Sequence, residues 1–238
     1  MSKPQVVPDA GRHYAAWAAV IGALLAWANI GLYVVATGGD LTAMLKPATA
    51  LALSSSAQQL FLLSMLFDSF GFYLPFLIIG GYLWARLRPR FGAPIDMATL
   101  CVGCYVLLGL AGTSMQMAAL PPLAEAHAAG DLVQRAASET AWMGLVHAAQ
   151  GGLWWMQGPL MAFWGIVVGH ALTTSGFRLG LILTVCGVLY GVYFVTAFLG
   201  LSQITEVVQL IMLFLLPLWM LLTGLRLFRQ PNLETGDI

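Results

Sequence analysis

Charged side chains are scarce in this sequence. They make up 8% of its 238 residues, whereas hydrophobic residues make up 60%. Soluble domains carry about 25% charged residues, so a water-soluble fold is excluded and an all-α, polytopic transmembrane helical bundle is expected. The formal net charge is zero, which leaves no basic surface for binding nucleic acid.

Catalytic and metal-binding motifs are also missing. The sequence contains no HExxH, no GxSxG and no glycine-rich phosphate loop. Its histidines offer no facing pair for haem, and no metal ligands have usable spacing. Cys101 and Cys104 have the spacing of a redox pair, but only Cys186 is left to shuttle electrons. We therefore expect no metal and no other cofactor, and an enzyme is the least favoured class.

Apolar runs long enough to cross a bilayer occur along the whole chain, since a span needs about 20 helical residues. We expect six spans, at 14–36, 58–85, 97–120, 142–172, 177–200 and 205–228. The chain, residues 1–238, is then a single integral membrane domain. The loop 37–56 is apolar enough in its middle to lie on the membrane surface, and 121–141 is expected to be exposed and polar.

Two sequence patterns predict where helices begin. Ser56 is followed by Gln59, and Asp131 is followed by Gln134. Both pairs have the spacing of a capping box, in which two side chains and two backbone N–H groups bond reciprocally. They predict starts for the second and the fourth helix, the latter well outside the bilayer.

The basic residues predict the orientation. If both termini lie on one side, that side collects eight of the ten Lys and Arg residues, and Lys46 and Arg135 remain on the other. Cytoplasmic loops carry an excess of Lys and Arg, so both termini are expected in the cytoplasm. The eight are Lys3, Arg12, Arg86, Arg88, Arg90, Arg178, Arg226 and Arg229.

The stretch 58–90 carries the strongest local signal, a carboxylate inside an apolar span. Asp68 lies about ten residues, or ~15 Å, from the start of this helix, close to the bilayer midplane. A carboxylate at that depth is unfavourable by several kcal/mol unless it is protonated, paired or facing water. We expect Asp68 to have a partner on another helix: His147, Asn29 or Gln150.

Further polar side chains reach a similar depth. Gln150, Trp154 and Gln157 share one face of the fourth helix, and His147 joins it three residues earlier. Polar groups in lipid must find each other or water, so a pocket open to the outside is expected. Its ligand- or proton-binding candidates are Asp68, His147, Gln150, Gln157, Asn29 and Trp154. The alternative is that these groups only lock the helices together.

Small residues predict close helix packing. The GxxxG patterns 165–169 and 187–191 let helix backbones approach each other, and they offer faces for a homo-oligomer. Broken helices line binding sites in transporters, although a kink can also serve packing alone. The fourth helix has the residues for such a break: Gly151, Gly152, Gly158 and Pro159.

One resemblance covers most of the chain. The polar-flanked first span, the outer loop, the FDSFGFYLPF helix ending in RLRPR and the tryptophan-rich fourth helix resemble small, six-helix bacterial inner-membrane proteins. These form domain-of-unknown-function families. The resemblance implies a location in the bacterial cytoplasmic membrane and supplies no catalytic or binding residue.

Two functions of different classes follow. The first is binding or transport of a small molecule, with proton coupling through Asp68. The second is an accessory or scaffolding subunit, in which the polar residues fix the fold and the tryptophan-rich faces meet a membrane-protein partner. In both cases the chain is embedded in the lipid bilayer. The ligand itself cannot be read from the residues.

Overall fold

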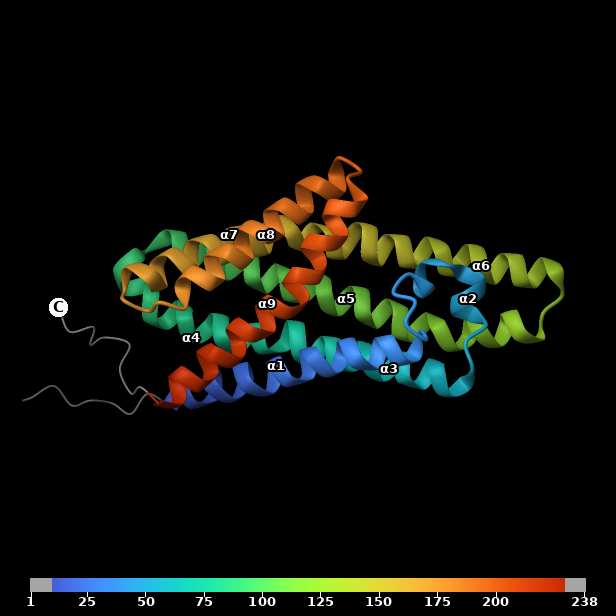
Figure 1. Ribbon diagram of the computed structural model, residues 1–238, viewed down its shortest axis with the longest axis horizontal. Coiled ribbons are helices and arrows are strands. Elements are labelled where there is room, and N and C mark those ends of the chain that lie inside the picture. Colours follow the sequence, from blue (N-terminus) through green and yellow to red (C-terminus); the bar gives the residue numbers. More distant parts are fainter. Residues whose placement is uncertain (1–9, 230–238) are drawn as a thin grey trace, which may run out of the picture.

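The computed structural model describes residues 10–229 and is helical along almost all of that range (Figure 1). The elements follow in chain order as α1 (Ala10–Ala36), η1 (Ala43–Leu45), α2 (Pro47–Leu51), α3 (Ser55–Asp68), η2 (Ser69–Tyr73), α4 (Leu74–Phe91), α5 (Ala93–Ala129), α6 (Leu132–Val146), η3 (His147–Trp154), α7 (Trp155–Thr174), α8 (Gly180–Phe198) and α9 (Ser202–Arg229). The segments η2 and η3 are π-helical, so they join α3 to α4 and α6 to α7 without a break.

Five helices of the described chain are long and apolar enough to cross a membrane. The protein is therefore a helical, multi-pass membrane protein. Four of them contain an expected span, and the fifth, Gly180–Phe198, is shorter than the expected 177–200. The expected span at 142–172 lies in the continuous helix 132–174. The bounds of the five helices are Gly11–Ala36, Ser55–Phe91, Ala93–Ala129, Gly180–Phe198 and Ser202–Arg229.

The polar stretch 121–141, which the sequence predicts to be exposed, is mostly helical and largely exposed. Helix α5 continues through Pro121 and Pro122, and only Gly130 and Asp131 separate it from α6. Burial of Leu120 and Ala124 favours continuing the helix here. Each proline lacks the N–H that would bond a carbonyl one turn earlier, but both prolines are exposed, so these carbonyls lie near solvent. With 37 residues α5 is about 55 Å long, well beyond the ~30 Å of a hydrocarbon core. Figure 1 shows α5 and α6 projecting together past the other helices.

The two predicted helix starts have different outcomes. Asp131 and Gln134 form the expected capping box at the start of α6. The N-cap residue of α3 is Ser54, whose Oγ accepts a hydrogen bond from the N–H of Ala57 at 3.3 Å. The choice of Ser56 is therefore wrong by two residues, because three serines in a row offer the same side chain at each position.

The segment 37–56, whose middle is predicted to lie on the membrane surface, packs against neighbouring helices. Here η1 and α2 fold against α5 and α6 and bury Met44 and Leu51. The indole Nε1 of Trp142 in α6 donates to the carbonyl of Met44 at 3.0 Å. We call this region, residues 37–54 with the ends of α5 and α6 that it contacts, the cap. Its apolar residues face a core of their own.

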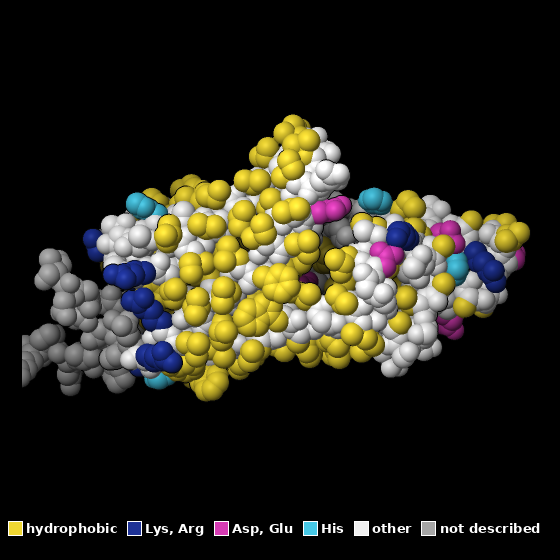
Figure 2. Space-filling view, in the orientation of Figure 1, with side chains coloured by type: hydrophobic (Ala, Val, Ile, Leu, Met, Phe, Trp, Pro, Cys, Tyr) yellow, Lys and Arg dark blue, Asp and Glu magenta, His cyan; other side chains and the backbone are white. Residues whose placement is uncertain are grey.

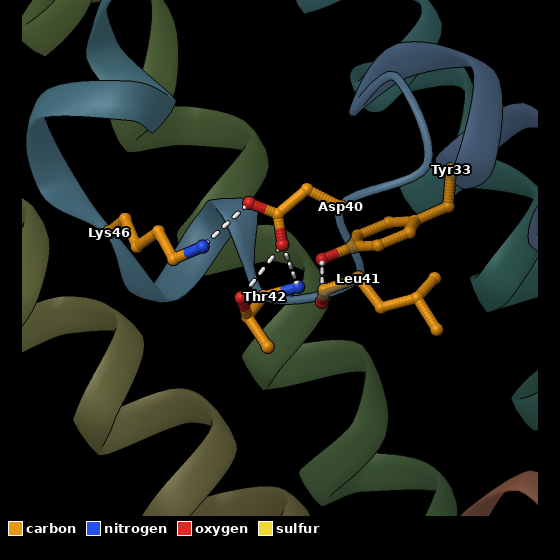
Figure 3. A network of polar contacts seen from close by, with 5 residues as sticks. All are labelled: Tyr33, Asp40, Leu41, Thr42 and Lys46. Carbon is orange, nitrogen blue, oxygen red and sulfur yellow. Dashed lines mark hydrogen bonds and ion pairs between the residues drawn. The ribbon is translucent and has the colours of Figure 1, made fainter.

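A polar network fixes the first turn of the cap (Figure 3). Asp40 accepts hydrogen bonds from the N–H and hydroxyl of Thr42, at 2.9 and 2.7 Å, and from Lys46 Nζ at 2.7 Å. The Tyr33 hydroxyl donates to the carbonyl of Leu41 at 3.1 Å. The hydrogen bond from Lys46 and those from Thr42 lower the pKa of Asp40 to about 2, so this carboxylate is ionised at neutral pH.

The GxxxG faces expected to serve a homo-oligomer are used inside the chain. A Cβ at Gly165 would lie 2.8 Å from the Cα of Gly187, and one at Gly169 would meet Gly180 and Thr184. These glycines therefore let α7 and α8 pack backbone against backbone.

Basic side chains gather at one end of the molecule (Figure 2). Here α1 begins, α9 ends, and the α4–α5 and α7–α8 turns lie (Figure 1). We call it the basic end, and the opposite one, with the cap and the α5–α6 turn, the cap end. Lys3, which is expected on the same side, lies outside the described residues. The described members of the group are Arg12, Arg86, Arg88, Arg90, Arg178, Arg226 and Arg229.

Candidate functional site

Asp68 is the last residue of α3 and lies directly before the π-helical turn of η2. It is 8% exposed, as is Asn29 of α1. Asn29 donates from Nδ2 to Oδ1 of Asp68 at 3.2 Å. The expected partner on another helix is therefore Asn29, and this bond ties α1 to the junction of α3 and η2.

The π-helical turn has two local causes. A Cβ on Gly71 would lie 2.5 Å from the backbone nitrogen of Ala26, so only glycine lets α1 approach this closely. Pro75 has no N–H and cannot donate the hydrogen bond that an α-helix needs at that position. The N–H of Leu74 instead bonds the carbonyl of Ser69, five residues back. Single π-turns of this kind are frequent at functional sites.

Tyrosines extend the cluster from Asp68 toward the other helices. The side chain of Tyr73 in η2 interacts with both Asp68 and Gln157. Gln157 of α7 donates to the carbonyl of Tyr105 in α5 at 3.1 Å. The Tyr105 hydroxyl donates back to the carbonyl of Phe72 at 3.1 Å. These polar contacts thus connect α1, η2, α5 and α7.

Tyr73 and Tyr105 were not among the sequence candidates. A tyrosine hydroxyl buried in an apolar span needs a hydrogen-bond partner, and that rule could have drawn attention to both. Their partners could not be found from sequence, because Phe72 and Gln157 are 33 and 52 residues from Tyr105.

Three polar side chains of the fourth helix contact α5 at successive positions. Gln150 Nε2 donates to Gln116 Oε1 at 3.4 Å, and Trp154 Nε1 donates to the carbonyl of Gly109 at 3.4 Å. With the bond from Gln157, three successive contacts follow one face of 147–174. We call these three contacts the α5 ladder. Gln150, Trp154 and Gln157 therefore share a face, as their spacing indicates.

His147 does not join that face. It is exposed, and among the described residues no hydrogen bond connects it to Asp68. It is the first residue of η3, and the wider π-helical turn alters the angular spacing on which the expectation rested. Gln150 likewise bonds to Gln116 rather than to Asp68.

Two recesses lie at the cap end. One, of about 780 Å³, is lined by η1, α2 and α6 and includes Lys46 and Glu139. The other, of about 550 Å³, lies between the start of α3 and the ends of α5 and α6, and includes His127 and Arg135. Neither is lined by any of the six candidates. His127 and Glu139 form an ion pair at 2.9 Å that holds α5 and α6 together here.

The surroundings of Asp68 leave an unsatisfied acceptor. Oδ1 of Asn29 is buried and has no hydrogen-bond partner. The face drawn in Figure 2 is hollowed where α9 diverges from α1, and an acidic side chain is visible at the floor. A buried acceptor without a donor is unfavourable by about 1–3 kcal/mol, so such an atom calls for an explanation.

Comparisons with protein-family models, with curated proteins and with solved structures give no match to this chain. The candidate site must therefore be interpreted from its own geometry.

Proposed function

We propose that this chain is a six-span membrane protein that binds a small solute at Asp68 and couples its passage to a proton. One observation carries the proposal: Asp68 is more than nine-tenths buried within a span, at a π-helical interruption, and accepts a hydrogen bond from Asn29 of α1. Ionisable residues inside membranes line ion or substrate pathways or relay protons. An interrupted helix beside such a residue is a recurring feature of transporters.

The packing supports a sixth span in the helix 132–174. Its α7 part lies between α5 and α8 and contacts both of them. Gln157, Pro159 and His170 lower its average hydropathy, but Gln157 is buried against Tyr105 rather than facing lipid. Six spans bring both termini to the basic end, which by the positive-inside rule lies in the cytoplasm. The bacterial inner membrane follows from the resemblance alone and stays a prediction.

Cysteine labelling in intact cells tests this topology. In a background without the three native cysteines, Ala129→Cys in the α5–α6 hairpin should react with a membrane-impermeant maleimide. Ser2→Cys and Thr235→Cys should react only after the cells are opened. Labelling of either terminal cysteine in intact cells would contradict the six-span arrangement.

Tryptophan fluorescence tests the proton coupling. Trp154 lies on the same α5 ladder as Gln157, which connects to Asp68 through Tyr73. The emission of the purified protein in lipid nanodiscs should change with pH in the wild type and lose that change in Asp68→Asn. His147→Gln is the control, since it alters an exposed residue outside the cluster. A pH response that vanishes in His147→Gln and persists in Asp68→Asn would reject proton coupling at Asp68.

A second candidate function is that of an accessory subunit with no transport activity. The α5 ladder favours it, because its three hydrogen bonds use polar side chains only to hold helices together. Intramembrane polar contacts can serve this purpose alone. In that case neither solute nor proton should change the fluorescence, and the protein should co-purify with a membrane-protein partner.

A further inference from the structure

The charge around Asp68 is unbalanced. Among the described residues no Lys, Arg or His forms an ion pair with Asp68. The other charged residues of the membrane-spanning helices lie near the helix ends; examples are Arg86, Asp96, Glu125 and Glu206. An ionised carboxylate at this position therefore has one unit of negative charge and no protein cation beside it.

The hydrogen-bonding capacity is unbalanced in the same direction. Asn29 gives its amide N–H to Asp68, and its own oxygen is buried without a donor. The carboxylate of Asp68 and the free amide oxygen of Asn29 belong to side chains that are hydrogen-bonded to each other, so both are available to one ligand. An additional hydrogen-bond acceptor would be repelled here. The site requires a cation or a donor.

Further oxygens belong to neighbouring residues of the chain. The Tyr73 side chain interacts with Asp68. Ser69 follows Asp68 in the chain, and its hydroxyl lies 3.2 Å from that of Thr113. Pro75 removes one backbone donor, so a carbonyl of the η2 turn loses its helical partner. Carboxylate, amide, hydroxyl and carbonyl oxygens are the ligands of hard cations, and carbonyls of interrupted helices coordinate sodium in transporters.

The burial of the site and its number of acidic ligands limit the kind of cation that it can bind. The described residues contain no group of three or more His, Cys, Asp or Glu that could hold a metal ion, which disfavours a divalent metal. Asp68 and Asn29 are each only 8% exposed, which disfavours an organic ammonium with a large body. We propose that the oxygens of Asp68 and Asn29 bind a monovalent inorganic cation, and that sodium is the ion.

This inference shares the site of the proposed function but does not depend on its proton. The test is thermal unfolding of the full-length protein in nanodiscs at one pH, in NaCl against choline chloride at equal ionic strength. Because a ligand stabilises by RT ln(1 + [L]/Kd), sodium at ten times its Kd should raise Tm by about 3–5 °C. The rise should saturate with sodium concentration, and KCl should produce a smaller one.

Variants separate specific binding from a general salt effect. Asp68→Asn should abolish the sodium-dependent rise, and Asn29→Leu should weaken it at least tenfold in apparent Kd. His147→Gln, which alters a residue outside the cluster, should keep the full rise. The absence of a rise in the wild type, or the same rise in Asp68→Asn, would overturn the inference. A sodium response together with pH-independent fluorescence would reject the proton coupling and keep the sodium site.

Discussion

The two π-helical segments have the same backbone irregularity and opposite surroundings. In η2 four of five residues are buried, namely Ser69, Gly71, Phe72 and Tyr73. In η3 only Ala149 of eight residues is buried. The first is pressed against α1 and tied to Asp68, whereas the second has its glycines in open space. Thus η2 fixes the position of Asp68, and η3 leaves most of its residues exposed.

The largest contrast between the segments should appear at their glycines. Gly71→Ala places a Cβ 2.5 Å from the backbone of Ala26, and overpacking of this kind lowers stability by about 1–3 kcal/mol or more. Gly151→Ala meets nothing within 4 Å and should be neutral or stabilise by up to ~1 kcal/mol, since alanine favours helix. Unfolding in mixed micelles measures both. Equal destabilisation would refute the contrast.

The next contrast concerns the polar side chain beside each segment. Asp68→Leu leaves the amide N–H of Asn29 without its acceptor and should lower stability by about 1–2 kcal/mol. Asp68→Asn keeps hydrogen-bonding capacity and should change stability less than Asp68→Leu. His147→Leu beside η3 should have an effect near zero, because His147 is exposed. The same micelle assay distinguishes the three. If Asp68→Leu is as stable as the wild type, the bond to Asn29 does not hold α1 in place.

A smaller difference should separate the two ends of the α5 ladder. Gln157 is buried and bonds at 3.1 Å, whereas Gln150 is half-buried and bonds at 3.4 Å. Intramembrane hydrogen bonds contribute ~0.6 kcal/mol on average and at most ~1.7. Gln157→Leu should approach the upper value and Gln150→Leu should fall below the mean. The reverse order would mean that η3 is held more firmly than its exposure indicates.

The smallest effect lies in the cap, outside both π-helical segments. Hydrogen bonds from Lys46 and Thr42 lower the pKa of Asp40 from 3.8 to about 2. Its contribution to stability is therefore complete above the unfolded-state value and is lost as pH falls through about 2. The Tm difference between wild type and Asp40→Asn should be small, constant from neutral pH down to about 4, and absent near the folded-state value. A difference that grows on acidification would contradict this.

Much of the architecture could be predicted because apolar runs of sufficient length are visible in one dimension. The carboxylate in the span, and the shared face of Gln150, Trp154 and Gln157, also follow from spacing, whereas Asn29 was one of three partners that depth alone allowed for Asp68. The capping box at Asp131 was readable for the same reason, since both of its residues are local.

The features that the sequence did not predict have one physical source. The helix through Pro121 and the burial of Met44 arise from contacts between distant segments, which override local preference. The position of His147 depends on a π-helical turn, and a turn of that kind has no reliable sequence signature. The hydroxyls of Tyr73 and Tyr105 joined the cluster through partners on other helices. Local patterns carry no information about such distances.

The continuity of 132–174 has a mechanical consequence. Helix α6 extends about 22 Å from η3 to its capping box, and it is paired with α5 through His127 and Glu139. A rotation of about 10° at the η3 turn would move the tip of α6 by ~4 Å. The η3 turn is therefore the point at which a small change of angle would be magnified at the tip of α6.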